Sequence, residues 1–583
     1  MKINDFSVQD FSGGTVRNKS DYAMNANEFR ETRNFDVDER GRLIRRRGFM
    51  VFGTDTGAFS VDSVIPWELK TLGATSTSFN LVVERDATAN VWKIISTILT
   101  SNVAVGDATI NVNSTVGFES SGSGVFEVEG DEINYTGTTA TTFTGCTNIR
   151  VAHASNVTAH QTVLVASATA LNASIGCYSA VLNNVLFLNG TGGSFTFDGT
   201  NVTAVSDADE PAGLFATNYR DRIYVAGDGT ADASGTRNGS RIRVSFSDAG
   251  DATSWDISNF FDVEDQSGED IVGLKVHKDR LFIFKPNSTF SFDEVQMKRS
   301  LVGVGAYNYR VIVEIDGVIY TACPSGVFTT NGFSAKKISQ PVEEYLKQLR
   351  PVFGSSQNRV ILNTYAWSFE KKYHLFIGNI TSPETMNNVV LVYDTTRGNW
   401  TVYEGFASLN LRDGNIMSAA SFNDADQTSG GGQRTSQKIE AVFGTDDSGQ
   451  IFRFFDNTAI TNLGLRSGGD IVADNVDDSA GTPISCVLET PFYDFNSNSW
   501  KRIGYFRLLS ERGSWNVFYR LDKGDRITDW IPLGEFNATN MRKRLKEQDC
   551  FRIAFKITGN QSSYVGILNG FSVEDIERID DTR

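Results

Sequence analysis

A recurring β-hairpin unit runs through most of this chain of 583 residues. Each copy has an apolar strand, a turn that often contains Asp-Gly or Asn-Gly, and a second strand, as in DGVIYTACPSGVFTTNG at 316–332. One such hairpin buries too little apolar surface to be stable alone, so neighbouring copies must stack. The first strands centre near six apolar residues: Phe187, Tyr224, Phe282, Ile319, Leu375 and Val442. Their intervals of 37, 58, 37, 56 and 67 residues are close to the length of a propeller blade with variable loops, and favour a β-propeller over the alternative, a set of sandwiches with similar hairpins.

Around this array the sequence changes character several times. The Thr-, Gly- and Ser-rich stretch 97–166 alternates with period two, which predicts a small inserted β-domain. The fold class we predict is all-β: a β-propeller-like hairpin array with an inserted small β-domain and a C-terminal β-sandwich. The predicted parts are an irregular N-terminal arm at 1–60, a propeller-like platform at 61–96 and 167–460, the insert at 97–166, a Gly/Asp/Asn-rich linker at 461–482 and the sandwich at 483–583.

Helical periodicity is clear in one place, SQPVEEYLKQLR at 339–350. Its apolar residues fall at i, i+3, i+4 and i+7, which predicts one short helix with a single buried face. We expect Ser339 to cap this helix and Pro341 to lie in its first turn.

Charge and composition exclude several classes of protein. The formal net charge is −16, and sequence-specific DNA-binding proteins need basic footprints. The chain has no run of about 18 apolar residues, which predicts no membrane span, and its first residues lack the apolar core of a signal peptide. Five widely spaced cysteines predict reduced, buried thiols rather than disulfides or a zinc site: Cys146, Cys177, Cys323, Cys486 and Cys550.

No catalytic motif is present, so we expect neither enzymatic activity nor a cofactor, and no metal site. His153 and His160 lie seven positions apart, which favours a surface histidine pair over a metal pair. DVDERG at 36–41 begins like a calcium-binding loop but has Arg47 where the last ligand should be, so it predicts a turn. SFSDAGDATSWDIS at 245–258 resembles the Asp-rich turn of sialidase propellers, in which Asp, Ser and Trp have structural roles.

Two basic clusters are the candidate interaction residues. The first contains Arg40, Arg42, Arg45, Arg46 and Arg47, and the second contains Arg542, Lys543 and Arg544 within MRKRLKEQ, which reads as a loop or short helix. They could touch DNA, but in so acidic a chain contact with an acidic neighbouring subunit is the preferred interpretation.

The N-terminal segment resembles tail proteins of short-tailed bacteriophages. That family has a Gly-Gly motif, then an Arg-Asn pair, then a G-x-L-x-x-R-x-G run. These correspond here to Gly13-Gly14, Arg33-Asn34 and the run from Gly41 to Gly48. RLFIFKPNSTFSFD and ISQPVEEYL also resemble the propeller core of the family, and the insert resembles a small β-module of phage structural proteins, with CTNIR replacing the usual CTRG.

The resemblance implies a tail nozzle or hub protein of the tail tubular protein B or packaged-DNA stabilisation type. Such a protein would form a ring, as a homohexamer, below the portal adaptor in the virion tail, after assembly in the host bacterial cytoplasm. The ring would retain the packaged genome and conduct double-stranded DNA without sequence specificity, with tail fibres or needle proteins at its side or tip. The alternative is a carbohydrate-binding or carbohydrate-cleaving propeller, suggested by Trp255, Trp367 and Trp400, although these tryptophans are expected to pack inside blades.

Overall fold

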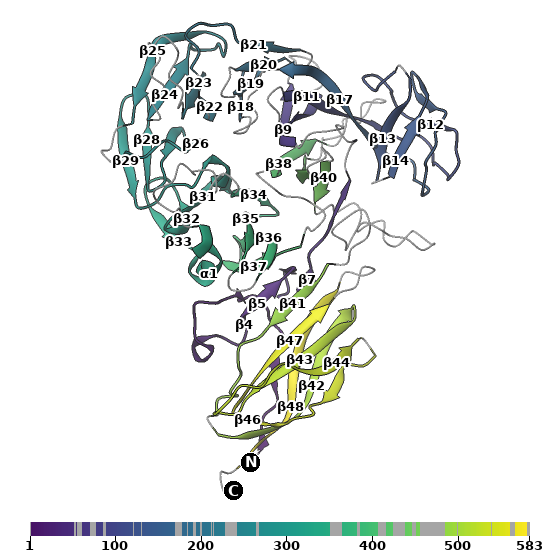
Figure 1. Cartoon of the computed structure of the whole chain (residues 1–583), viewed down its shortest axis with the longest axis vertical. Helices are drawn as coiled ribbons and strands as arrows, with labels where there is room; N and C mark the ends of the chain where they lie inside the picture. The colour runs from purple at the N-terminus through teal and green to yellow at the C-terminus, as the bar shows by residue number, and fades with distance from the viewer. Residues whose placement is uncertain are drawn as a thin grey trace.

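The computed structural model has an upper ring of sheets, a lower β-domain and an insert at one side of the ring (Figure 1). The structure describes residues 2–51, 54, 61–69, 77–84, 89–120, 122–129, 131–169, 178–183, 185–189, 194–198, 201–211, 213, 215–227, 242–263, 268–349, 364–381, 385–405, 416–423, 438–445, 451–454, 484–497, 499–537, 539–559 and 566–579. The predicted linker at 461–482 and Cys177 lie outside these residues.

The ring is a β-propeller, in which the described residues form seven four-stranded antiparallel blades. Blades 1 to 3 comprise β9 (Val61–Leu69), β10 (Thr77–Glu84), β11 (Ala89–Ile98) and β17 (Thr158–Thr169); β18 (Tyr178–Leu182), β19 (Val185–Asn189), β20 (Phe195–Phe197) and β21 (Val202–Ala204); and β22 (Phe215–Tyr219), β23 (Arg222–Ala226), β24 (Arg243–Ser247) and β25 (Trp255–Asp262). Blades 4 and 5 comprise β26 (Gly273–His277), β27 (Arg280–Phe284), β28 (Ser288–Phe292) and β29 (Met297–Val302); and β30 (Val313–Ile315), β31 (Val318–Cys323), β32 (Gly326–Thr330) and β33 (Ala335–Lys337). Blades 6 and 7 comprise β34 (Tyr365–Phe369), β35 (Lys372–Ile380), β36 (Met386–Asp394) and β37 (Asn399–Tyr403); and β38 (Ile416–Asn423), β39 (Lys438–Thr445), β40 (Ile451–Phe454) and β8 (Phe49–Val51).

The prediction of stacked hairpin repeats is confirmed, with one difference in which strand of each blade the repeat residues occupy. The six apolar residues that define the repeat lie on β19, β23, β27, β31, β35 and β39, which are the second strands of their blades and not the first. Blades 3 to 6 also share one turn between their first two strands. In each, both central residues have positive φ, as at Asp316 (48°) and Gly317 (75°), which is the geometry of a type I′ hairpin turn.

The ring is closed by the N-terminal part of the chain. In blade 7, β8 pairs antiparallel with β40 and thereby supplies the outermost strand of a sheet whose other strands come from 416–454. The paired residues on the two sides of the closure are just over 400 positions apart in the sequence, as Phe452 and Val51 are, so the ring cannot close until the N-terminal segment is in place.

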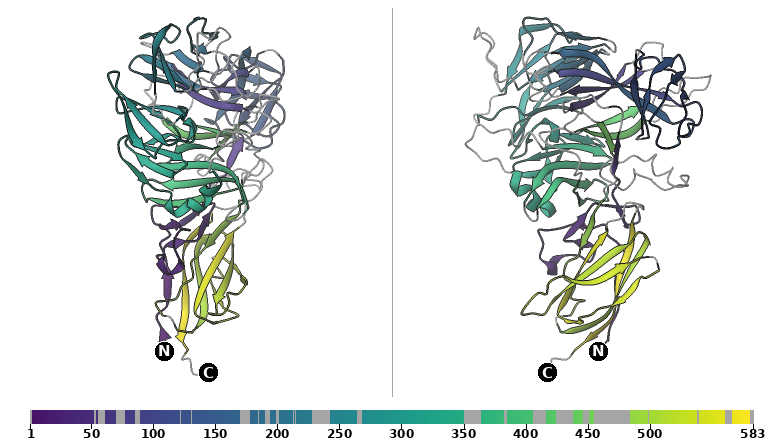
Figure 2. Two further views of the ribbon diagram at one scale, coloured as in Figure 1. Left: turned by 60° about the vertical axis from the view of Figure 1, so that its left-hand side comes forward. Right: turned by 45° about the vertical axis from the view of Figure 1, so that its right-hand side comes forward.

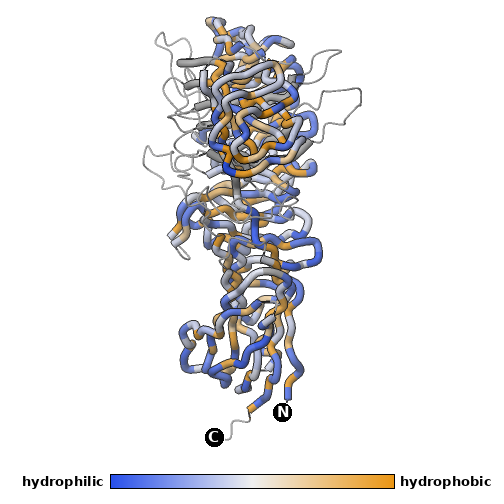
Figure 3. The backbone as a smooth tube through the Cα atoms, turned by 90° about the vertical axis from the view of Figure 1, so that its right-hand side faces the viewer, coloured by the Kyte–Doolittle hydropathy of each residue, from blue (hydrophilic) through white to orange (hydrophobic). Residues whose placement is uncertain are grey.

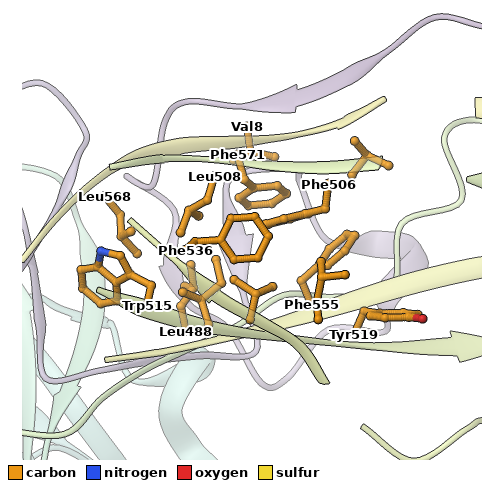
Figure 4. Packing of buried hydrophobic residues seen from close by; sticks show 14 of the residues in the cluster. Val8, Leu488, Phe506, Leu508, Trp515, Tyr519, Phe536, Phe555, Leu568 and Phe571 are labelled. Atoms are coloured by element: carbon orange, nitrogen blue, oxygen red, sulfur yellow. The ribbon is translucent and has the colours of Figure 1, made fainter. Parts of the chain in front are cut away.

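The lower β-domain packs two sheets around one apolar core. One sheet contains β1 (Lys2–Ile3), β2 (Phe6–Val8), β6 (Phe35–Val37), β7 (Leu43–Arg45), β42 (Lys501–Arg512), β45 (Arg542–Arg544), β46 (Asp549–Cys550) and β48 (Ile567–Arg578). The other contains β5 (Glu31–Arg33), β41 (Cys486–Glu489), β47 (Arg552–Gly559), β43 (Trp515–Asp522) and β44 (Ile531–Phe536). The rings of Phe506, Phe555 and Phe571 cluster between the sheets (Figure 4). The segment predicted as an irregular arm thus contributes strands to both sheets, and Figure 2 shows it running beside the C-terminal strands.

The insert leaves blade 1 between β11 and β17 and has a core of its own. Its strands are β12 (Thr109–Asn111), β13 (Gly124–Val128), β14 (Asp131–Tyr135), β15 (Gly137–Thr139) and β16 (Thr142–Thr144). Phe118, Phe126, Tyr135 and Phe143 pack together inside it. Hydrophilic and hydrophobic segments are interspersed along the backbone of the described residues, in the propeller and in the β-domain alike (Figure 3).

One helical segment occurs where the sequence predicts it, at 339–350. The predicted helix is a short helical segment made of η3 (Gln340–Val342), α1 (Glu343–Leu346) and η4 (Lys347–Leu349), and Val342, Tyr345 and Leu346 are buried as expected. The predicted cap is wrong, because the Ser339 hydroxyl accepts a hydrogen bond from the Val327 amide instead.

The four described cysteines are free and buried, as predicted. Two further short helices, η1 (Asp21–Ala23) and η2 (Tyr309–Val311), complete the helical content of the described residues. None of the helices described is long and apolar enough to cross a membrane.

Candidate functional site: the joint between the propeller and the β-domain

The propeller and the β-domain share one strand of the N-terminal segment. β5 pairs in parallel with β37 of blade 6 through Arg33 and Val402, and antiparallel with β41 through Glu31, Thr32 and Arg33. A single nine-stranded sheet therefore runs from blade 6 into the β-domain. We call the residues around β5 that hold the two parts together the joint: Gly13, Gly14, Arg17, Glu31, Arg33, Asn34, Asp36, Arg45 and Arg46, with Lys372, Trp400, Tyr403 and Glu404 of blade 6.

Glu31 lies at the centre of the joint with 1% of its surface exposed. It accepts hydrogen bonds from Arg17 and, at 2.7 Å, from Arg33 Nε. Arg33 also reaches the propeller, since its Nη1 lies 2.9 Å from Glu404 Oε1. Burying a carboxylate is costly unless it is paired and hydrogen-bonded, and here two guanidinium groups compensate Glu31.

Asn34 and Arg46 form a second connection. Asn34 has φ of 58°, a left-handed conformation that Asn tolerates better than most residues. Its Nδ2 donates to Ser485 O (2.7 Å), and its Oδ1 accepts from Arg46 Nε (2.8 Å) and from the Glu404 amide (2.9 Å). Arg46 is fully buried, donates to Glu404 O at 3.0 Å and lies over the ring of Tyr403. One amide side chain thus bonds both the β-domain and the propeller.

Two glycines allow the backbones to approach closely at the joint. A Cβ on Gly14, whose φ is +63°, would lie 2.4 Å from Trp400 O. A Cβ on Gly13 would lie 2.3 Å from Asn27 O. Real Cβ atoms do not approach backbone oxygens this closely, so only glycine fits at either position.

A partly buried polar cluster connects β6 to blade 6. Asp36 Oδ1 accepts hydrogen bonds at 2.5 Å from both Lys372 Nζ and the Tyr403 hydroxyl. Burial alone would raise the pKa of Asp36, but the Lys372 charge and these two hydrogen bonds outweigh it and hold the pKa below its usual value. His374 lies beside them, and its ring stacks on Trp367. Its pKa is lowered to about 3, mainly by burial and, to a smaller extent, by the charge of Lys372. His374 is therefore neutral at physiological pH.

The three motifs of the N-terminal resemblance meet in this joint. Gly13-Gly14 permits the close approach, Arg33-Asn34 bonds both parts of the molecule, and Arg46 stands at the arginine of the G-x-L-x-x-R-x-G run. Sequence reasoning missed Glu31, Asp36 and Glu404. The partners of Asp36 and Glu404 are 336 and 371 positions away, so nothing local marks these two residues, whereas Glu31 pairs with the nearby Arg17 and Arg33 and only its burial was unforeseen.

The structure corrects the interpretation of the first basic cluster. Arg45 and Arg46 are fully buried within the chain, Arg45 over the Trp515 ring, so neither can touch DNA or a second subunit. Arg42 is half-buried between Asp38 and Glu511, and Arg47 pairs with Glu370 at 3.3 Å. Arg40 alone of the five is exposed.

The second basic cluster is an edge strand, β45, and not the loop or short helix predicted. Arg542 pairs with Glu574 at 2.6 Å and lies 3.7 Å from the centre of the Tyr505 ring. Lys543 is half-buried near the Phe536 ring, and Arg544 is exposed.

The predicted surface histidine pair is wrong, because both side chains are buried. His153 Nδ1 lies 2.9 Å from Glu129 and its Nε2 lies 3.2 Å from Asp131, while His160 bonds Ser96 at 2.8 Å. Among the described residues, no group of three or more His, Cys, Asp or Glu side chains could hold a metal ion.

The two loop-like motifs are structural, as predicted. Asp38 Oδ1 accepts the amides of Arg40 and Arg42 in the β6–β7 turn. In the Asp-rich turn, Ser247 Oγ accepts the Ile223 amide, Ser254 bonds Asp248, and the buried Trp255 donates to Ala252 O.

Comparison with known proteins gives only distant structural likenesses. No protein-family model matches the chain, and no curated protein sequence matches it. BamB from Moraxella catarrhalis is 10% identical, with 69% of this chain and 99% of that chain covered and a TM-score of 0.31. The Neurospora crassa Pan2 WD40 domain is 8% identical (64% and 97% covered, TM-score 0.28). An exo-β-1,3-galactanase from Phanerochaete chrysosporium is 10% identical (68% and 95% covered, TM-score 0.22). Scores this low carry no argument about function, so the propeller assignment rests on the strand order of the blades.

Proposed function

We propose that this chain is a structural virion protein, the tail nozzle or hub ring that continues the DNA channel below the portal adaptor. One observation carries the proposal: the three motifs that resemble those of phage tail proteins converge on the joint of an all-β, two-part chain. Residues that form the buried joint fix how the β-domain is attached to the propeller. A fixed arrangement of its parts is what a structural component of a ring needs. The chain would have no enzymatic activity, and it would act in the virion tail.

The charge distribution supports a channel through which DNA passes without being held. The chain carries a net charge of −16, and four of the five arginines at 40–47 are buried or ion-paired inside it. Affinity for DNA grows with the number of phosphates that Lys and Arg neutralise. An acidic lumen would therefore retain the genome only by closing the channel and would conduct it freely once open. The partners would be further copies in a homohexamer, the adaptor, and tail fibres or needle proteins.

The alternative function is weakened by the tryptophans that suggested it. Trp255, Trp367 and Trp400 are all buried in blades, and Trp400 donates its ring N–H to Ile338 O at 2.8 Å. Sugar-binding platforms need an exposed aromatic face, which none of the three presents.

Native mass spectrometry and negative-stain images of the purified chain, alone and with its adaptor, test the proposal. We expect closed rings, formed alone or on the adaptor. A chain that stays monomeric and never binds the adaptor would contradict it. A glycan array and a host-polysaccharide cleavage assay test the alternative; binding or cleavage that depends on exposed carboxylates would favour it instead.

A further inference from the structure

The insert is an acidic projection on one side of the propeller. Between 97 and 166 the chain has six acidic residues and one basic residue, Arg150. Glu119 is exposed and Glu132 is half-buried, and Val116 beside Glu119 is 86% exposed. Glu127 and Asp131 are buried, so the acidic surface of the insert comes from Asp107, Glu119, Glu129 and Glu132, and no residue that the structure describes covers Val116.

The opposite side of the propeller has the complementary character. Here β29 and β33 are the outermost strands of blades 4 and 5, and Figure 1 places them across the ring from β12, β13 and β14 of the insert. Lys298, Arg299 and Lys336 are exposed on these strands and form no ion pair with any residue that the structure describes. We call this surface the basic rim; it also contains the exposed residues Val295, Val302 and Phe333.

Protection of a sheet edge does not by itself account for the basic rim. Lysines on edge strands commonly prevent unwanted strand pairing, which could explain Lys298 and Lys336. That role would not require Val302 at 75% exposure on β29, or Val295 at 86% exposure in the turn that precedes this strand. Exposed apolar residues among unpaired charges are typical of a surface that is covered in an assembly.

We propose that the insert of one copy docks against the basic rim of the next copy. The two surfaces carry opposite charge, and each exposes apolar side chains that the contact would bury. They lie on opposite sides of the same chain, as a head-to-tail contact requires, and such a contact closes into a ring when its rotation permits. The inference rests on the proposed ring and names the surfaces that would build it.

Charge reversal and rescue test the proposal. The rim variant Lys298→Glu with Arg299→Glu should weaken ring formation by at least about tenfold, because it faces like charges toward each other. The insert variant Glu119→Lys with Glu132→Lys should do the same. A chain with all four substitutions restores opposite charges and should form rings again.

A matched control separates the contact from the overall charge. Arg526→Glu with Lys546→Glu changes the net charge by the same amount at exposed positions of the β-domain and should leave ring formation unchanged. All four rim and control positions are exposed, so thermal unfolding should stay close to that of the wild type. Equal loss of rings in the control and the rim variant would overturn the proposal, as would a four-substitution chain that does not recover.

Cross-linking identifies the occupant directly. Carbodiimide treatment of wild-type rings made from mixed isotope-labelled chains should join Glu119 of one chain to Lys298 of another through a new amide bond. Rings in which Lys298 cross-links only to other segments would overturn the inference and leave the proposed function intact. A wild-type chain that forms no ring would instead fail the proposed function, and the inference with it.

Discussion

The blades and the joint are stabilised in different ways. In a blade, strands that follow one another in the sequence pair with each other, and the buried side chains are mostly aromatic and aliphatic, as in blades 3 and 4. In the joint, charged and amide side chains bond partners more than 300 positions away, as Arg33 does with Glu404 and Lys372 does with Asp36.

This difference indicates which contacts fix the arrangement of the propeller and the β-domain. Apolar packing is non-directional and tolerates substitutions of similar volume. Buried charges are costly unless each finds its partner with good geometry, so they favour one arrangement over its competitors. Apolar packing therefore stabilises the blades, while the charged and amide side chains of the joint determine how the β-domain is attached to the propeller.

The largest expected effect in the joint follows loss of its central charge. Glu31→Gln keeps the size of the side chain but leaves the guanidinium groups of Arg17 and Arg33 without their buried carboxylate. We expect a loss of about 3–5 kcal/mol in the free energy of unfolding, measured by urea denaturation.

Its control is Glu547→Gln, which removes a half-exposed partner of Lys523 at 2.9 Å. Exposed ion pairs contribute about 1 kcal/mol or less. Equal effects of the two substitutions would show that the joint charges have no special role.

A smaller loss of stability is expected from substituting Gly14, and a comparison with Gly317 separates steric crowding from backbone conformation as its cause. Gly14 and Gly317 both have positive φ, +63° and +75°, but a Cβ at Gly317 would meet nothing within 4 Å. Gly14→Ala should therefore cost about 1–3 kcal/mol more than Gly317→Ala, because only the first forces the chain against Trp400 O. Equal changes in thermal stability would mean that the joint relaxes without cost.

Acid should weaken the joint through protonation of Asp36. The pKa of Asp36 is lower in the folded chain than its ordinary value of 3.8, so its contribution is present above that value and is lost as the pH falls through the lowered pKa. Asp36→Asn should be less stable than the wild type at neutral pH, and the gap should narrow below about pH 4. Thermal unfolding across this range measures the gap, and a gap that does not depend on pH would contradict the assignment.

The blades could be predicted from the sequence because their contacts are local. An apolar second strand recurs at blade-length intervals along the sequence. The dipeptide Asp316-Gly317 by itself indicates a tight turn. The equivalent turns at Arg220-Asp221, Lys278-Asp279 and Glu370-Lys371 contain no glycine, so their identity was visible only in the backbone.

The joint could not be predicted in the same way. Five arginines within eight residues have the pattern of a solvated or DNA-contacting face, and only the tertiary structure shows that Arg45 and Arg46 are interior. The motifs of the resemblance lie between Gly13 and Gly48, but the roles of these residues depend on partners in blade 6 and β41.

Hydrogen–deuterium exchange of residues 28–47 in the isolated chain tests the central claim most directly. If this segment is the interior joint, its amides should be protected as strongly as those of β35 and β47 and should open together with them. Exchange within seconds, as in an arm that only a second subunit orders, would contradict the account.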